Sequence, residues 1–159
     1  MGRAELVQVY EAINAATHGS TLSFYRLEGD RAASVISASV PDNQTAACWV
    51  VVTRQGQYAY TSNTASDSLS TYAVSPIGEL SLSQSVAAAT GHTPLDLGLD
   101  RNDQHLYVLH GGDGSVDAHA IGGDGTLQHI DNQPSAPTTA PSTRLVARSS
   151  PTAHGAPCS

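Results

Sequence analysis

Five side chains in this sequence are of types that can carry acid–base or binding chemistry. Asp96 and Glu11 are carboxylates able to act as general bases, and His92 can serve as a proton donor or as an electrophile. Gln44 and Trp49 offer an amide and an indole that can hold a ligand. We therefore take Asp96, His92 and Glu11 as candidate catalytic residues, and Trp49 and Gln44 as candidate substrate-binding residues.

Plain structural roles are open to the same residues. Asp96 can accept backbone N–H groups at the start of a strand, His92 can be a solvated loop residue, and Trp49 can pack in a core. The remaining histidines show no metal-ligand spacing, since His105 and His110 are five residues apart across a strand end. We expect structural or surface roles for all of them, namely His18, His105, His110, His119, His129 and His154. The sequence thus predicts no metal and no cofactor.

Two glycine–aspartate segments, residues 111–114 and 122–125, are similar at first sight to calcium-binding repeats. Such a repeat would need Asp at the position that Val116 occupies, and two turns do not make a stack of sites. Gly and Asp are also the residues that tight hairpin turns prefer. We expect both segments to be plain turns.

The elements that must position the candidate residues come from an internal repeat. Residues 48–82, shifted by 47 positions, align without a gap on residues 95–129. The identical pairs are Arg54 and Arg101, Gln57 and Gln104, Tyr60 and Tyr107, Ser68 and Ser115, Ala73 and Ala120, Gly78 and Gly125, and Leu80 and Leu127. A repeat of this length, built from short strands, is typical of propeller blades.

Alternating apolar residues and turn residues divide the chain into short strands. They are expected at residues 6–12, 21–27, 33–40, 48–53, 58–62, 68–74, 80–86, 95–99, 105–109, 115–121 and 127–131. The run 48–53 is continuously apolar, as in a strand buried on both faces. The sequence predicts an all-β fold of four-stranded antiparallel blades. It would comprise a partial blade at 1–40, complete blades at 41–90 and 91–137, and a disordered tail at 138–159.

In a propeller, the first strand of each blade lines a central channel, and the loop leading into that strand borders the mouth. Gln44 and His92 would stand in such loops, while Trp49 and Asp96 would occupy equivalent positions on two first strands. Glu11 follows a second-strand pattern and would point toward the same mouth.

Several blade motifs, in order, carry a resemblance to a known family: SFYRLEGDRAASVISASVPDNQTAACW, QTAACWVVVTRQGQYAYTSN, SLSTYAV and PLDLGLDRNDQHLYVLHGGDGSVDAHAI. They resemble the lactonase-type seven-bladed β-propeller family, which includes 6-phosphogluconolactonase-like proteins and carboxymuconate cyclases. The resemblance covers residues 6–133. It implies a hydrolase-like protein of carbohydrate metabolism that opens a small-molecule lactone or handles a sugar acid. A non-catalytic binding or scaffold module, or an inactive truncated product, is the alternative.

That family's propeller needs about seven blades, whereas this sequence supplies two blades and part of a third. We therefore expect a fragment or truncated product that is inactive alone. Each uncovered blade face loses burial worth about 25 cal/mol per Å². Marginal stability or self-association through the open faces is expected in consequence.

The charge pattern bears on the partners. The formal net charge is −7, and all seven cationic side chains are Arg, which argues against nucleic acid and anionic membrane surfaces. A phosphorylated lactone would favour a cation at the channel, but Arg54 and Arg101 fall in hairpin turns.

No apolar run approaches the roughly 20 residues that cross a bilayer. The N-terminus has no signal-peptide core, so the localisation is unknown and the cytoplasm is only the default expectation.

Overall fold

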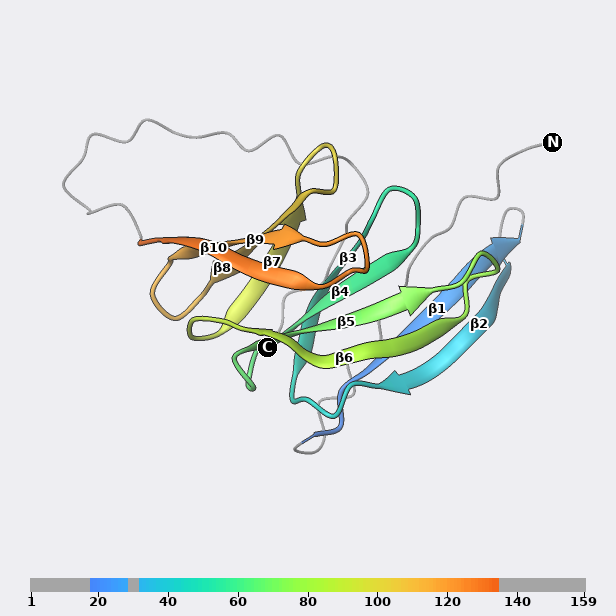
Figure 1. Ribbon diagram of the computed structural model, residues 1–159. Coiled ribbons are helices and arrows are strands. Elements are labelled where there is room, and N and C mark those ends of the chain that lie inside the picture. Colours follow the sequence, from blue (N-terminus) through green and yellow to red (C-terminus); the bar gives the residue numbers. More distant parts are fainter. Residues whose placement is uncertain (1–17, 29–31, 135–159) are drawn as a thin grey trace.

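The computed structural model describes residues 18–28 and 32–134 (Figure 1). Within these ranges, ten β-strands form three antiparallel sheets of two, four and four strands. The all-β fold of antiparallel four-stranded blades is thus confirmed. The strand expected at 6–12 and the tail expected at 138–159 lie outside the described residues.

The strands follow the chain without crossovers. The first sheet contains β1 (Thr21–Glu28) and β2 (Ala32–Pro41); the second contains β3 (Ala47–Val52), β4 (Tyr58–Asn63), β5 (Ser68–Val74) and β6 (Leu80–Ala89); the third contains β7 (Pro94–Leu99), β8 (His105–His110), β9 (Val116–Ile121) and β10 (Leu127–Gln133). Both four-stranded sheets are simple meanders in chain order. Figure 1 shows the second sheet between the other two.

The first sheet is the outer half of a blade. A shift of 47 residues places β1 on β5 and β2 on β6, so the pair corresponds to the third and fourth strands of a full blade. The strands agree with the sequence pattern apart from their ends. Strand β6 continues beyond the expected residue 86 because Ala88 and Ala89 still pair with Leu69 and Ser68 of β5.

The second sheet is covered by apolar contacts on both faces. On one face, Val50 joins a buried cluster with Leu22 of the first sheet. On the other face, Trp49 and Val51 pack against a cluster that includes Leu97 of the third sheet. Successive residues of a strand point to opposite faces, so a continuous apolar run serves both neighbours. Each fully buried side chain of this kind stabilises the fold by about 2 kcal/mol.

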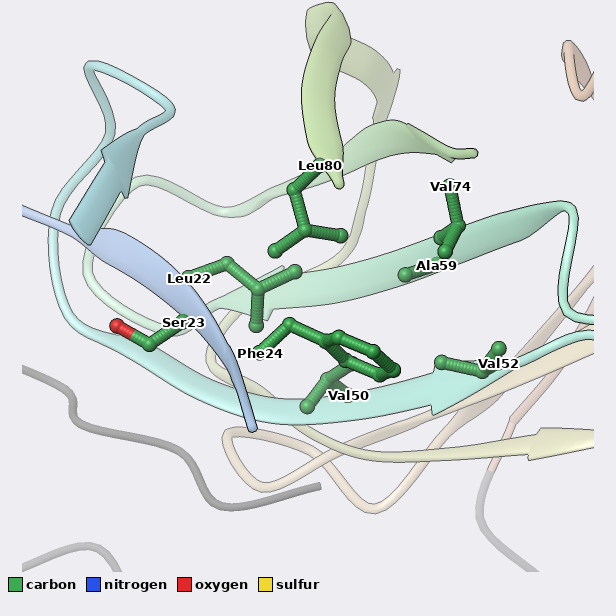
Figure 2. Close-up of a pocket in the computed structure, with 8 residues that line it drawn as sticks. All are labelled: Leu22, Ser23, Phe24, Val50, Val52, Ala59, Val74 and Leu80. Carbon is green, nitrogen blue, oxygen red and sulfur yellow. The ribbon is translucent and has the colours of Figure 1, made fainter. Parts of the chain in front are cut away.

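A small apolar cavity marks the contact between β1 and the second sheet (Figure 2). Figure 2 shows Leu22 and Phe24 of β1 facing side chains from the second sheet. The complete lining consists of Leu22, Ser23, Phe24, Val50, Val52, Ala59, Val74 and Leu80. Because every lining residue except Ser23 is apolar, this cavity is a packing region and offers no acid–base chemistry.

Glycine is required in the turns between the third and fourth strands. Gly78 and Gly125 have φ values of 93° and 80°, in the left-handed region that favours glycine. Each also lies against an aromatic ring of the preceding sheet, Phe24 for Gly78 and Tyr58 for Gly125. A side chain at either position would meet that ring, so these turns fit onto the neighbouring blade only as glycine.

Both glycine–aspartate segments are turns, as expected. Asp113 Oδ1 accepts the N–H of Ser115 at 2.9 Å. Asp124 Oδ1 accepts the N–H of Thr126 at 3.1 Å and its hydroxyl at 2.7 Å. These carboxylates bind within their own turns, and the same hydrogen bonds lower their pKa values.

Candidate functional site

His92 stands in the loop that leads into β7, where a carboxylate of the preceding sheet holds it. Its side chain is 85% exposed, and its Nδ1 lies 3.1 Å from Oδ2 of Asp67. The other oxygen, Asp67 Oδ1, accepts the backbone N–H of Thr93 at 2.8 Å. One carboxylate from the β4–β5 turn therefore fixes both the imidazole and the backbone of the next blade's loop.

Asp96 lies on β7, opposite Leu109 of β8, and is exposed. Partial burial of its carboxyl raises the pKa above the ordinary value of 3.8, and the N–H of Leu97 opposes part of that shift. A carboxylate with a raised pKa is a stronger base than an ordinary one. His92 is paired with Asp67, not with Asp96, so the structure shows no direct interaction between the two candidate catalytic residues.

Trp49 is partly buried in the contact between the second and third sheets. Its backbone N–H donates to the hydroxyl of Ser62 at 3.1 Å. Trp49 and Asp96 are equivalent under the repeat, and their partners across the sheet, Ser62 and Leu109, are equivalent as well. Trp49 therefore faces the third sheet, and Asp96 lies on the corresponding face of that sheet.

Gln44 belongs to a hydrogen-bonded network at the ends of the first two sheets. Its Nε2 donates to Ser85 Oγ at 2.8 Å, and its Oε1 accepts from Ser68 Oγ at 3.2 Å. Its backbone N–H donates to Asp42 Oδ1 at 2.8 Å. Both ends of the amide are therefore engaged within the protein.

Asp42 is a buried carboxylate that the sequence pattern did not single out. It is fully buried, and its Oδ2 has no hydrogen-bond partner. Burial raises its pKa, and the backbone N–H of Gln44, which donates to Oδ1, opposes part of the shift. A Pro-Asp-Asn turn before a strand is a common sequence, so only the folded arrangement distinguishes this aspartate from a surface one.

A Ser–His–Asp arrangement occurs in the third sheet, but it is buried. His110 Nδ1 lies 2.9 Å from Ser115 Oγ, and His110 Nε2 lies 3.3 Å from Asp117 Oδ2. All three residues are almost fully buried. The equivalent positions in the second sheet are Asn63, Ser68 and Ser70, and Asn63 Nδ2 donates to both serines at 3.3 and 2.8 Å. Because the three residues are buried, a substrate cannot reach them. The second sheet fills the equivalent positions with a different hydrogen-bonded set, so we assign the His110 network to bracing the β8–β9 hairpin.

The remaining expectations fall on other parts of the chain. Glu11 lies outside the described residues. Within residues 18–28 and 32–134, no group of three or more His, Cys, Asp and Glu side chains is arranged to hold a metal ion. Across the same ranges, no helix is long and apolar enough to span a membrane.

Consecutive four-stranded meanders that pack face to face define a β-propeller. Within that class, the chain belongs to the lactonase family of seven-bladed β-propellers, whose family model matches residues 6–143.

Known proteins are similar to this chain in sequence or in structure, at low identity. The uncharacterised protein YwcC of Lactococcus lactis is 30% identical over 92 residues, which cover 56% of this chain and 27% of that protein. The periplasmic gluconolactonase of Pseudomonas aeruginosa superposes with a TM-score of 0.60 at 17% identity, covering 77% of this chain and 38% of that one. A putative 6-phosphogluconolactonase of Bacteroides fragilis gives a TM-score of 0.57 at 19% identity, covering 81% of this chain and 35% of the other. The chain therefore spans little more than a third of the solved structures it matches.

Proposed function

We propose that this chain forms part of a propeller that hydrolyses an unphosphorylated sugar-acid lactone, with Asp96 as the general base. The observation that carries the proposal is Asp96 itself. The residue is exposed on the first strand of a blade. Neighbouring protein atoms still remove part of the water around its carboxyl, and this desolvation raises the pKa of the group. Membership of the lactonase family supports the reaction class, and a Pseudomonas aeruginosa protein of the same fold is described as a gluconolactonase.

In this scheme, Asp96 takes a proton from a water molecule whose oxygen attacks the lactone carbonyl carbon. The ring C–O bond then breaks, and the ring oxygen receives a proton to give the open-chain acid. His92 supplies that proton. Its Nδ1 is occupied by Asp67 Oδ2 at 3.1 Å, so Nε2 is the atom that would donate.

The arginines of the described residues support an unphosphorylated substrate. Arg54 donates from its guanidinium to the carbonyl of Arg101 at 2.6 Å, and Arg26 donates to the carbonyl of Ile77 at 3.3 Å. Arg54 and Arg101 follow the ends of β3 and β7, whereas His92 precedes β7. Within the described residues, no arginine therefore stands beside His92 to bind a phosphate.

The test is hydrolysis of glucono-1,5-lactone by the purified chain, followed as acid release. Asp96→Asn should abolish turnover above the spontaneous rate. Asp124→Asn is the matched control, because its carboxylate serves only its own turn, and it should leave turnover unchanged. The enzyme proposal requires turnover from the purified chain itself, in contrast to the expectation of a fragment that is inactive alone. If the unaltered chain shows no turnover above background, the enzyme proposal fails for this chain and that expectation stands.

A non-catalytic binding or scaffold module is the second candidate. Trp49 and Gln44 favour its scaffold form, because packing engages the indole and hydrogen bonds engage the amide, so both side chains serve the contacts between sheets. Calorimetric titration with gluconate and with the lactone separates the two functions. Saturable binding without acid release supports the module, whereas neither binding nor turnover supports an inactive product.

A further inference from the structure

The first and third sheets lie on opposite sides of the second sheet (Figure 1). Each of them has exposed apolar side chains. In the third sheet, Tyr107 and Leu109 are each 42% exposed and alternate with Leu106 and Val108, which are buried against the second sheet. They therefore lie on the face turned away from the second sheet. We call this the β8 face.

The first sheet has a corresponding outer face. Phe24 of β1 packs toward the second sheet, so its neighbour Tyr25 points away from it. Val35 of β2 pairs directly with Tyr25 and shares that side, where it is 55% exposed. We call this the β1 face.

The repeat shows what normally covers the β8 face. Tyr60 is the equivalent of Tyr107, and it is fully buried against the third sheet. Its hydroxyl donates to the carbonyl of Gly125 in the next blade at 3.2 Å. The same side chain is therefore buried where a following sheet covers it and 42% exposed on the third sheet, which is the last sheet of the described residues.

The repeat also shows what the β1 face fits. Tyr25 and Val35 are the equivalents of Tyr72 and Leu82 in the second sheet. Tyr72 and Leu82 belong to the cluster that packs against the preceding sheet. The β1 face thus presents side chains at the positions that cover a preceding blade, and the β8 face presents those that receive a following one.

We propose that the β8 face of one molecule packs against the β1 face of a second copy of this chain. The contact repeats the packing already present between successive sheets of one molecule. It joins two different faces, so it is a head-to-tail contact that can continue from copy to copy. Asp96 pairs with Leu109 and so shares the β8 face, and the contact would therefore cover the base assigned under the proposed function. The association itself requires no enzymatic activity.

Sedimentation velocity from about 1 to about 100 µM tests the proposal. The unaltered chain should show an average mass that rises at least twofold with concentration. Tyr107→Glu on the β8 face and Val35→Glu on the β1 face should each sediment as monomers. Val86→Glu is the charge-matched control: Val86 lies on the outer strand β6 and is 54% exposed, and this variant should associate like the unaltered chain.

A mixture of the two monomeric variants gives the decisive result. Each variant keeps one intact face, so together they should form a one-to-one dimer and nothing larger. A symmetric contact between two β8 faces would instead leave Val35→Glu associating and give no dimer specific to the mixture. Leu109→Asp and Ala33→Glu serve as replacements if circular dichroism shows that either variant is unfolded. A monomer at every concentration, or a mixture that stays monomeric, overturns the proposal.

Discussion

The hydroxyl of Tyr60 offers a sharp test of the packing between blades. Tyr60→Phe removes the hydrogen bond to the Gly125 carbonyl, which spans 3.2 Å between two sheets. Burial also raises the pKa of Tyr60 and so keeps its hydroxyl in the neutral, donating form. The substitution keeps the ring, so packing changes little.

The expected loss follows from the burial of both partners. A neutral hydrogen bond contributes about 1 kcal/mol, and a buried carbonyl left without a donor adds about 1 kcal/mol more at most. We expect the free energy of unfolding to fall by about 1–2 kcal/mol. With a urea slope of about 1 kcal/mol per molar, the midpoint should fall by about 1–2 M.

The repeat supplies the control at the equivalent position. Tyr107 is 42% exposed, and the part of the chain that the structure describes places no further sheet against it. Tyr107→Phe should therefore leave the midpoint unchanged in urea titrations at about 1 µM, where association is weak. Equal shifts for the two variants, or no shift for Tyr60→Phe, would refute the inferred blade contact.

Three further predictions concern other buried positions. Gly125→Ala should lower stability by more than about 1 kcal/mol, because Gly125 has a φ of 80° and lies against the Tyr58 ring. Gly56→Ala, with a φ of 69° and open space around it, should lower the urea midpoint less. The folded pKa of Asp42 is raised above 3.8, so its contribution is fully present below pH 3.8 and is lost as pH rises through the folded pKa. Asp42→Asn should therefore melt at a higher temperature than the unaltered chain at pH 7, with the gap closing near pH 4. Burial lowers the pKa of His119 below 6.5, so stability should fall as pH drops below 6.5, and melting curves of His119→Leu should show a smaller fall.

The fold was predictable from the sequence because local and repeated signals agree. The apolar run at 48–53 predicted a strand buried on both faces, and β3 packs against both neighbouring sheets. The 47-residue shift predicted equivalent strands, and the Trp49–Ser62 pairing recurs as Asp96–Leu109. The sequence pattern did not predict that β6 extends beyond residue 86 to Ala89. That extension depends on pairing with Ser68 of β5 and not on alternation of apolar and polar residues.

The candidate site was harder to predict because its contacts join different blades. The loop position of His92 was readable, but its partner Asp67 comes from a turn 25 residues earlier and pairs only once two sheets pack. Trp49 and Gln44 have types that suit binding, yet burial and hydrogen bonding in neighbouring segments decide their surroundings. Asp42 carried no sequence signal, since burial alone sets its chemistry.

The central position of the second sheet has a consequence for the order in which backbone amides become accessible to solvent. Within β4, Ala59 faces the first sheet and Tyr60 faces the third, and their exposed fractions are 1% and 0%. In an array whose units contact only their neighbours, the interior unit opens after those at the ends. Amide hydrogens of β4 should therefore exchange only through global unfolding, while those of β2 and β10 exchange through local fraying. The exchange rates of the β4 amides should therefore report the free energy of global unfolding of the three sheets.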